Sequence, residues 1–114
     1  MINLKDETLE VLEGHGYTVN DIEWVGSDAY EISQDYFWEL ADREYDDGYG
    51  SEEVCTDLII GMKDGSWFER ENYDGAEWWK HKIPVRRPNM YLAEPKTLFI
   101  ENGKYFLGEY NVQS

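Results

Sequence analysis

Three dipeptides that favour tight turns constrain this chain most, namely Asp64-Gly65, Asp74-Gly75 and Asn102-Gly103, and each of them stands between apolar runs. Asp-Gly and Asn-Gly are the strongest short-range signals for a two-residue hairpin loop, because both central positions of a type I′ turn need a positive φ. We therefore expect a three-stranded meander over residues 57–82 and a further hairpin near the C-terminus.

Loop length sets the register of such a meander, since each added residue shifts every later pair. If the first two loops have two residues each, Arg70 lies opposite Trp79 in one neighbouring strand and opposite Ile59 in the other. All three prolines fall within residues 83–95. Because proline cannot donate to a strand ladder, this segment is expected to be a connector or a sheet edge.

Two helices are expected before the meander. Residues 4–13 carry a stripe of leucines after Asn3, whose side chain can cap the first turn. A second helix is expected over roughly 34–45, capped by Ser33. Residues 21–33 alternate apolar and acidic positions on either side of a Gly-Ser-Asp stretch, which predicts a hairpin. The predicted inner face of the second helix consists of Tyr36, Phe37, Leu40 and Ala41.

The length and composition favour one folded domain over residues 1–114. The chain has 114 residues with 41% hydrophobic and 16% aromatic residues, which is too apolar for a disordered segment despite its charge. We predict an α+β fold, in which two short helices pack on an antiparallel sheet. That sheet would be built from a hairpin, a three-stranded meander and a C-terminal hairpin.

Negative charge is concentrated in the first part of the chain. The formal net charge is −15, and residues 1–79 hold 22 acidic and 4 basic residues, whereas residues 80–114 hold 3 acidic and 6 basic residues. Such a body repels nucleic acids and anionic membranes and attracts basic protein surfaces. The one basic stretch, residues 79–89, is expected either to pair with the protein's own acids or to mark the back face of the domain, so we predict no direct nucleic-acid or membrane partner.

Residues 42–53 have the length of a calcium-binding loop. Asp42, Glu44, Asp46 and Glu53 occupy positions 1, 3, 5 and 12 of an EF-hand loop. Position 6, which should be glycine, is Asp47, and the segment that follows is strand-like where a helix should begin. We therefore favour an acidic loop without a metal, and expect no cofactor.

The residues that could support catalysis are few. The sole cysteine, Cys55, suits a reducing cytoplasm, and its apolar surroundings in the sequence suggest a small buried side chain rather than a nucleophile paired with His81. No phosphate loop, nucleophile elbow or dinucleotide motif is present. No basic leader and no long apolar run occur. We therefore predict a non-enzymatic cytoplasmic protein.

The acidic residues with interspersed tyrosines form the best candidate for a partner-binding surface. One group follows the second helix, with Tyr45 and Tyr49 as possible interface anchors, and a second group surrounds the turn at Asp74-Gly75. The predicted partner-binding residues are Glu39, Asp42, Glu44, Asp46, Asp47, Tyr49, Glu52, Glu53, Glu69, Glu71, Asp74 and Glu77.

Parts of this chain resemble known proteins. The stretch Asp-Asp-Gly-Tyr-Gly, then Leu-Ile-Ile, then WFERENYDGAEWW resembles small acidic proteins encoded by phages and plasmids of Gram-positive bacteria, some of which act as anti-CRISPR proteins. The stretch DIEWV is similar to one found in a small type II anti-CRISPR protein. The resemblance covers roughly residues 20–80, and it implies action in the cytoplasm of a bacterial host.

Charge and resemblance together predict an inhibitor of a bacterial defence nuclease. The acidic surface would imitate the charge density of DNA and occupy a basic groove, with the RNA-guided effector of a type II CRISPR system as the expected partner. Two alternatives stand beside it. One is an acidic protein-interaction module without mimicry, and the other is a calcium-binding module or a small hydrolase.

Overall fold

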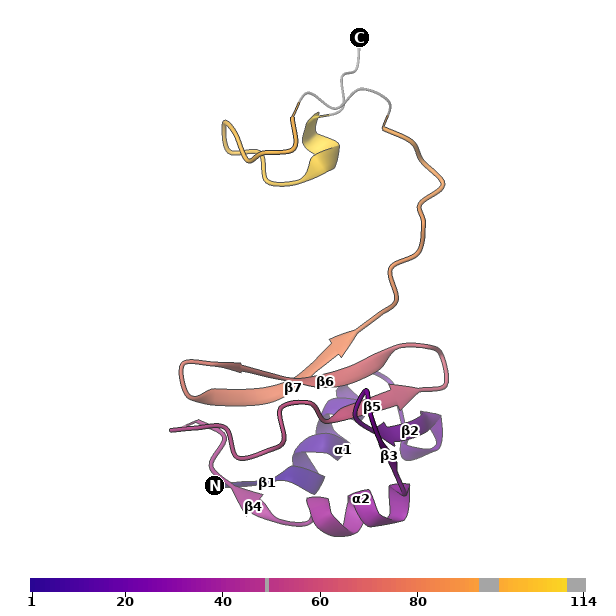
Figure 1. Ribbon diagram of the computed structural model, residues 1–114, viewed down its shortest axis with the longest axis vertical. Helices are drawn as coiled ribbons and strands as arrows, with labels where there is room; N and C mark the ends of the chain where they lie inside the picture. The colour runs from indigo at the N-terminus through magenta and orange to yellow at the C-terminus, as the bar shows by residue number, and fades with distance from the viewer. Residues whose placement is uncertain (49, 93–96, 111–114) are drawn as a thin grey trace. The chain divides into compact units, whose positions relative to one another are not determined.

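The computed structural model describes residues 1–48, 50–92 and 97–110. By its own contacts the chain divides into two units, Met1–Pro84 and Val85–Ser114 (Figure 1). That the whole chain is one domain stays a prediction. Both α-helices and all the strands that the structure describes lie in the first unit, and so do the candidate surfaces.

The elements of the first unit follow the expected α+β class. They are, in chain order, β1 (Ile2–Asn3), α1 (Leu4–Gly14), a 3₁₀ turn (Val19–Asp21), β2 (Ile22–Gly26), β3 (Glu31–Ile32), α2 (Gln34–Ala41), β4 (Glu44–Tyr45), β5 (Ile59–Met62), β6 (Trp67–Tyr73) and β7 (Ala76–Lys82). Five of the strands form one antiparallel sheet in the order β3-β2-β5-β6-β7, and β1 pairs with β4 separately. The α+β prediction is confirmed.

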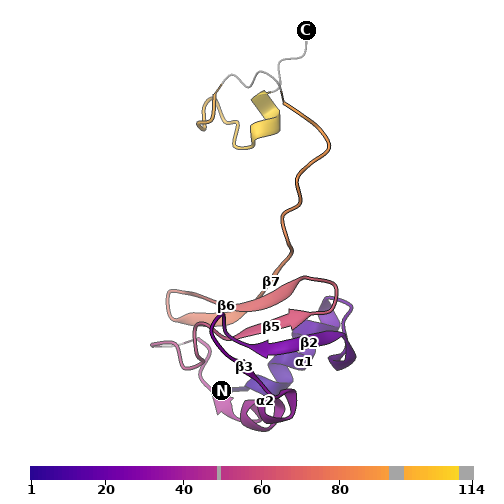
Figure 2. The same cartoon turned by 45° about the vertical axis from the view of Figure 1, so that its right-hand side comes forward.

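The core lies between this sheet and the two helices, which cover the same face (Figures 1 and 2). Leu12 of α1 and Phe37 of α2 pack with Val25, Ile60 and Phe68 of the sheet, and all five are almost fully buried. Both helices begin at the expected caps. The Asn3 side chain accepts from the backbone N–H of Asp6, and that of Ser33 accepts from Tyr36.

The second helix is shorter than predicted. It ends at Ala41, because Glu44 and Tyr45 leave it to pair with β1. Its inner face is also different, since Tyr36 and Leu40 are mostly exposed while Phe37 and Ala41 are buried. The 3.6-residue period of a helix places Tyr36 with Leu40 on one stripe and Phe37 with Ala41 on another, and packing against the sheet selects the second stripe.

The meander forms, but one of its two loops is longer than predicted. Tyr73 pairs with Ala76 across Asp74-Gly75, where both central residues have positive φ, so Arg70 lies opposite Trp79 as expected. The other loop has three residues, because Met62 donates its backbone N–H to the carbonyl of Ser66. The extra residue moves Glu69, instead of Arg70, opposite Ile59.

The second unit holds the predicted turn but not the strands around it. Asn102 and Gly103 both have positive φ, and a single bridge joins Glu101 to Lys104. Among residues 97–110 the rest is irregular, apart from a 3₁₀ turn at Leu107–Tyr110. The described part of this unit contains no strand, so the predicted C-terminal hairpin is wrong as a strand pair.

Candidate interaction surface

The segment after β4, residues 46–48 and 50–54 in its described part, is called the acidic loop below. Hydrogen bonds that involve backbone N–H groups hold it against the turn between β6 and β7. The N–H of Glu77 donates to the carbonyl of Asp47 at 2.8 Å. The N–H groups of Glu53 and Val54 donate to the Glu77 carboxylate at 2.7 and 3.2 Å. Gly75 lies beside the backbone of Gly50, and its φ of +86° favours glycine at this turn. The two predicted acidic groups are therefore brought together.

Glu77 is the one predicted partner-binding residue that cannot serve as surface. Its side chain is only 3% exposed and lies 2.9 Å from Nη2 of Arg70. The sequence shows Glu77 as one more acid beside a turn. Glu77 alternates with Ala76 and Trp78 along β7, and its side chain lies on the buried face of the strand, the same face as Trp79. There it neutralises the buried Arg70 and accepts hydrogen bonds from the acidic loop.

Arg70, Glu7, Tyr45 and Glu77 make up the Arg70 centre. Arg70 reaches Glu7 at 3.4 Å and the hydroxyl of Tyr45 at 3.1 Å, and its guanidinium lies 4.8 Å from the ring centroid of Trp79. The Tyr45 hydroxyl in turn donates to Glu7. Tyr45, an expected interface anchor, is thus a buried structural residue, which corrects that interpretation.

Burial governs titration in this centre. Desolvation raises the pKa of Glu7, although the hydrogen bond from Tyr45 and the charge of Arg70 oppose the shift. Desolvation, together with the hydrogen bond to Glu7, also raises the pKa of the Tyr45 phenol well above its ordinary value. Tyr45 therefore stays neutral and donates its proton to the Glu7 carboxylate.

The remaining predicted residues divide into two groups. Glu39, Asp42, Glu44, Glu52, Glu53 and Asp74 are exposed, and Asp46 and Asp47 are half-buried. Glu69 and Glu71 are half-buried on β6, where they alternate with the core residues Phe68 and Arg70. They consequently face away from the helices and lie on a separate surface. Tyr49 lies outside the described residues.

Residues 42–53 do not adopt a calcium-loop arrangement in their described part. Glu53 accepts from the backbone N–H of Asp46, and Asp46 accepts from that of Gly48. A search of the residues that the structure describes finds no group of three side chains placed to hold a metal ion. The carboxylates at positions 5 and 12 of the proposed loop thus serve the loop's own backbone.

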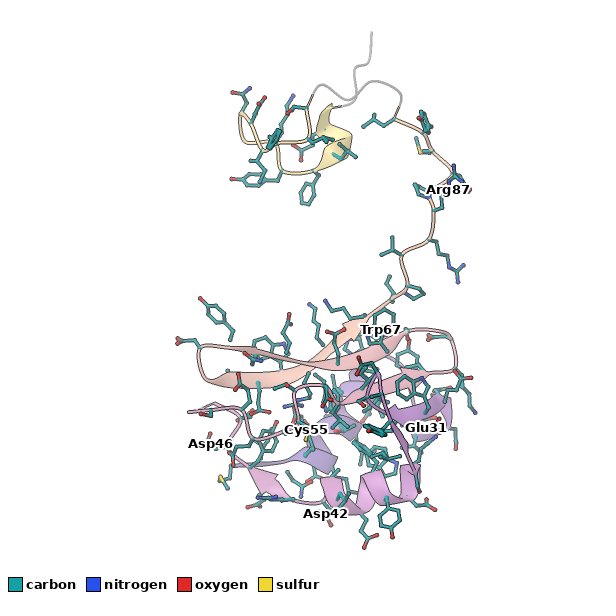
Figure 3. All side chains as sticks on the ribbon, viewed as in Figure 1. Glu31, Asp42, Asp46, Cys55, Trp67 and Arg87 are labelled. Atoms are coloured by element: carbon teal, nitrogen blue, oxygen red, sulfur yellow. The ribbon has the colours of Figure 1, made fainter. Side chains whose placement is uncertain are left out.

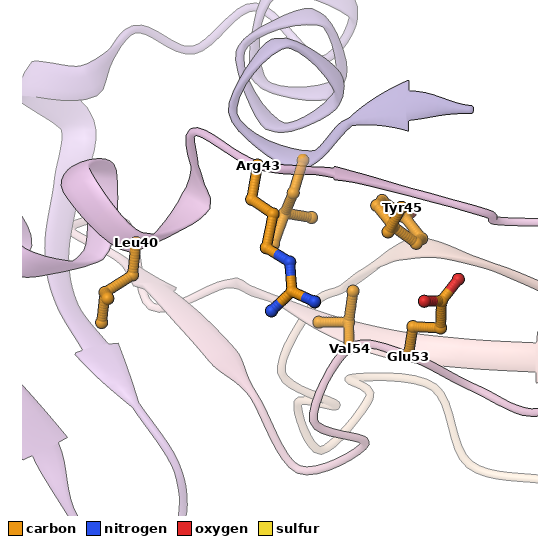
Figure 4. Close-up of a pocket in the computed structure, with 6 residues that line it drawn as sticks. Leu40, Arg43, Tyr45, Glu53 and Val54 are labelled. Carbon is orange, nitrogen blue, oxygen red and sulfur yellow. The ribbon is translucent and has the colours of Figure 1, made fainter.

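A small apolar pocket of about 130 Å³ lies within the exposed acidic group (Figure 4). Leu4, Leu40, Tyr45 and Val54 supply its apolar lining, and Arg43 and Glu53 its polar lining. Arg43 immediately precedes β4, and its guanidinium points toward Val54 (Figure 4). Sequence reasoning missed this pocket because Leu40 was expected to lie in the core.

Cys55 is exposed, so the expectation that it is a buried small side chain is wrong. Among the described residues, no helix is long and apolar enough to cross a membrane. Comparison of the chain with protein-family models, with characterised proteins and with solved structures finds no match. The proposal below therefore depends on the chain's own charge and geometry and on the short resemblance given above.

Proposed function

We propose that this protein inhibits a bacterial defence nuclease by occupying its basic nucleic-acid groove. The partner that fits best is the RNA-guided effector nuclease of a type II CRISPR system, which reads its target motif with arginines and holds nucleic acid in positive channels. In this proposal the protein catalyses no reaction. It acts in the cytoplasm of the host bacterium.

One observation carries the proposal: the surface acids are not neutralised within the first unit. In the described part of Met1–Pro84, both ion pairs are made by Arg70, with Glu7 and with Glu77. The exposed carboxylates of the acidic loop, and those of Glu39 and Asp42 at the C-terminal end of α2, therefore make no ion pair among the described residues of this unit. The negative potential of this surface would speed association with a basic groove, and binding would release the anions that the groove holds.

The second support is the fixed position of the acidic loop. Its hydrogen bonds to Glu77, which is itself fixed by Arg70, hold Glu52 and Glu53 near Asp74 across the β6–β7 turn. A preorganised set of charges loses little conformational entropy on binding. DNA presents about one charge per 1.7 Å of helix axis, so an imitation of it requires several carboxylates held close together.

The test is a DNA-cleavage assay with a purified type II effector loaded with guide RNA. The variant Glu44→Lys, Glu52→Lys, Asp74→Lys reverses three exposed acids that make no side-chain hydrogen bond among the described residues. The control Glu10→Lys, Glu13→Lys, Asp35→Lys changes the net charge equally on the helices. We expect wild type and control to inhibit cleavage and the first variant to lose at least tenfold in inhibitory potency.

Three results would contradict the proposal. Wild-type protein that leaves cleavage unchanged would remove this class of partner. Equal inhibition by both triple variants would favour an acidic interaction module without mimicry. Equal loss in both would show that net charge, rather than this surface, is responsible.

A further inference from the structure

The face of the five-stranded sheet that the helices leave uncovered carries a row of aromatic side chains. Trp24 of β2 pairs with Gly61 of β5, and Gly61 pairs with Trp67 of β6, so the two indoles flank a glycine. Both tryptophans are half-buried. Trp67 lies at the sheet and well away from Asp42, which lies beside α2 (Figure 3). This surface is therefore separate from the acidic loop.

Gly61 is what allows the row to form. A Cβ added to it would lie 2.0 Å from Nε1 of Trp24, so the Trp24 indole lies directly over the glycine backbone. A hollow of about 300 Å³ opens beside it, lined by Trp24, Trp67, Ile59 and the exposed Glu23. Its walls are thus two indole rings with a carboxylate at the rim.

A second hollow of about 280 Å³ follows along β5 and shares Ile59 with the first. Its polar lining includes three carboxylates, those of Asp28, Asp57 and Glu69. Glu69 joins the two hollows, because it accepts a hydrogen bond from Nε1 of Trp67 at 2.8 Å. On the far side of β6, Lys80 and Lys82 lie opposite Glu69 and Trp67, so the acidic part of this face ends there.

Aromatic walls beside carboxylates fit a guanidinium group. Arginine stacks its planar cation on an indole face and donates hydrogen bonds to carboxylates, and its positive charge strengthens both interactions, whereas a neutral side chain of the same shape lacks that charge. Both hollows are lined by Ile59, so they adjoin on this face of the sheet. Successive side chains on the same side of an extended peptide are about 6–7 Å apart, so such a peptide can place one side chain in each hollow.

We propose that this outer sheet face binds an extended protein segment with two arginines on the same side of the segment, one stacked on the indoles of Trp24 and Trp67 and the other among Asp28, Asp57 and Glu69. The charge complementarity of the two hollows selects this occupant over an apolar one. Asp57 follows the acidic loop in the connection between β4 and β5, but none of the residues that line the two hollows belongs to the predicted loop acids Asp46, Asp47, Glu52 and Glu53, and the site does not depend on the proposed nuclease inhibition.

The experiment follows the five indole N–H signals of the protein by NMR during titration. The probe is the peptide acetyl-Gly-Arg-Gly-Ser-Gly-Arg-Gly-amide, and the comparison peptide carries citrulline in place of both arginines. We expect the indole signals of Trp24 and Trp67 to move and those of Trp38 and Trp79, which lie on the helix side, to stay. Tryptophan-to-phenylalanine variants assign the signals one by one.

Two variants separate this site from general charge attraction. Trp67→Leu keeps the net charge and should weaken the binding of the arginine peptide at least tenfold. The loop variant Glu52→Lys, Asp74→Lys changes the net charge by four and should bind within threefold of wild type at 0.15 M salt, where charges beyond about 8 Å are screened. If Trp67→Leu does not fold, the wild-type shift pattern decides alone.

The proposal is overturned if no indole signal moves at millimolar peptide, or if the signals of Trp38 and Trp79 move as far as those of Trp24 and Trp67. It is also overturned if the citrulline peptide gives the same shifts, because the cation would then be irrelevant. A larger effect from the loop variant than from Trp67→Leu would place the peptide on the acidic loop instead.

Discussion

Two polar clusters lie side by side on the inner face of the β6–β7 hairpin and are stabilised by different interactions. The Arg70 centre is built around the cross-strand pair Arg70–Trp79. The second cluster is built around the cross-strand pair Phe68–His81, which lies two residues further along the same two strands. In the first, a buried cation is neutralised by two carboxylates. In the second, which we call the Tyr17 cluster (Tyr17, Asp64, Ser66 and His81), the link is made by hydroxyl hydrogen bonds and a stacked imidazole.

The Tyr17 cluster has its own geometry. The Tyr17 hydroxyl donates to Asp64 at 2.6 Å and lies 3.0 Å from the Ser66 hydroxyl and 3.3 Å from Nε2 of His81. The His81 ring stacks on Phe68 with centroids 4.6 Å apart. Because Asp64 is exposed, its charge needs no buried partner. Burial thus decides whether a polar cluster requires ion pairs or can rely on neutral hydrogen bonds.

The largest expected effect comes from removing the central cation. Arg70→Met leaves the buried Glu77 and the half-buried Glu7 without a counter-charge, so we expect a loss of about 3–5 kcal/mol in the free energy of unfolding. Urea unfolding followed by circular dichroism measures it. Adding Glu7→Gln and Glu77→Gln to the same variant should recover part of the loss, and a loss below about 1 kcal/mol would show that Arg70 is not the centre's organising charge.

A smaller loss is expected where the Arg70 centre meets α1. Trp79 donates from Nε1 to the hydroxyl of Thr8 at 2.9 Å, and both residues are buried. Trp79→Phe removes that donor and leaves the Thr8 oxygen with one partner fewer, which costs about 1–2 kcal/mol in urea unfolding. The control is Trp78→Phe on the outer face, and equal losses in the two variants would contradict the assignment.

Within the Tyr17 cluster a single hydroxyl joins three partners. Tyr17→Phe removes it, and we expect a loss of about 1 kcal/mol in the free energy of unfolding, the usual net contribution of such a bond. Tyr73→Phe, at a tyrosine that is 76% exposed, should change the stability far less. A Tyr17→Phe variant as stable as Tyr73→Phe would mean that water replaces the hydroxyl at no cost.

The smallest expected effect distinguishes the two clusters by pH. Burial, and next the charge of His15, holds the pKa of His81 below the roughly 6.5 of a free histidine. The unfolded chain therefore binds the proton first as the pH falls, so the stability should decrease below about pH 6.5 and level off once folded His81 is also protonated. Hydrogen bonds from Ser66 and Tyr17 hold the pKa of Asp64 at about 2, so its contribution lasts to much lower pH.

Glu7 should respond in the opposite direction. Its raised pKa means that the folded state binds a proton more readily than the unfolded chain, so its titration favours folding as the pH falls toward its ordinary range. Measuring urea midpoints between pH 7 and pH 5 for wild type and His81→Phe checks the assignment. An unchanged slope in His81→Phe would show that His81 does not cause the decrease.

Local chemistry in the sequence was sufficient for the helix starts and for two hairpins, the one predicted over residues 21–33, where β2 pairs with β3, and the one formed by β6 and β7. Asn3 and Ser33 cap helices as predicted, and Asp74-Gly75 forms the expected two-residue loop, because each of these depends on a few neighbouring residues. Most of the acidic candidate surface could also be predicted, since carboxylates without a buried partner stay in water. The outer aromatic row could not, because it needs the β2–β5–β6 register.

Only the tertiary structure decided which charged residues turn inward. Arg70 and Glu77 look like their exposed neighbours in the sequence, and their burial follows from a strand period of two combined with the face that the helices cover. The first meander loop shows the same limit, since Asp64-Gly65 permits two or three loop residues and one residue reverses the faces. Sequence determines local geometry and total charge, whereas register and packing determine which charges meet a partner and which hold the fold.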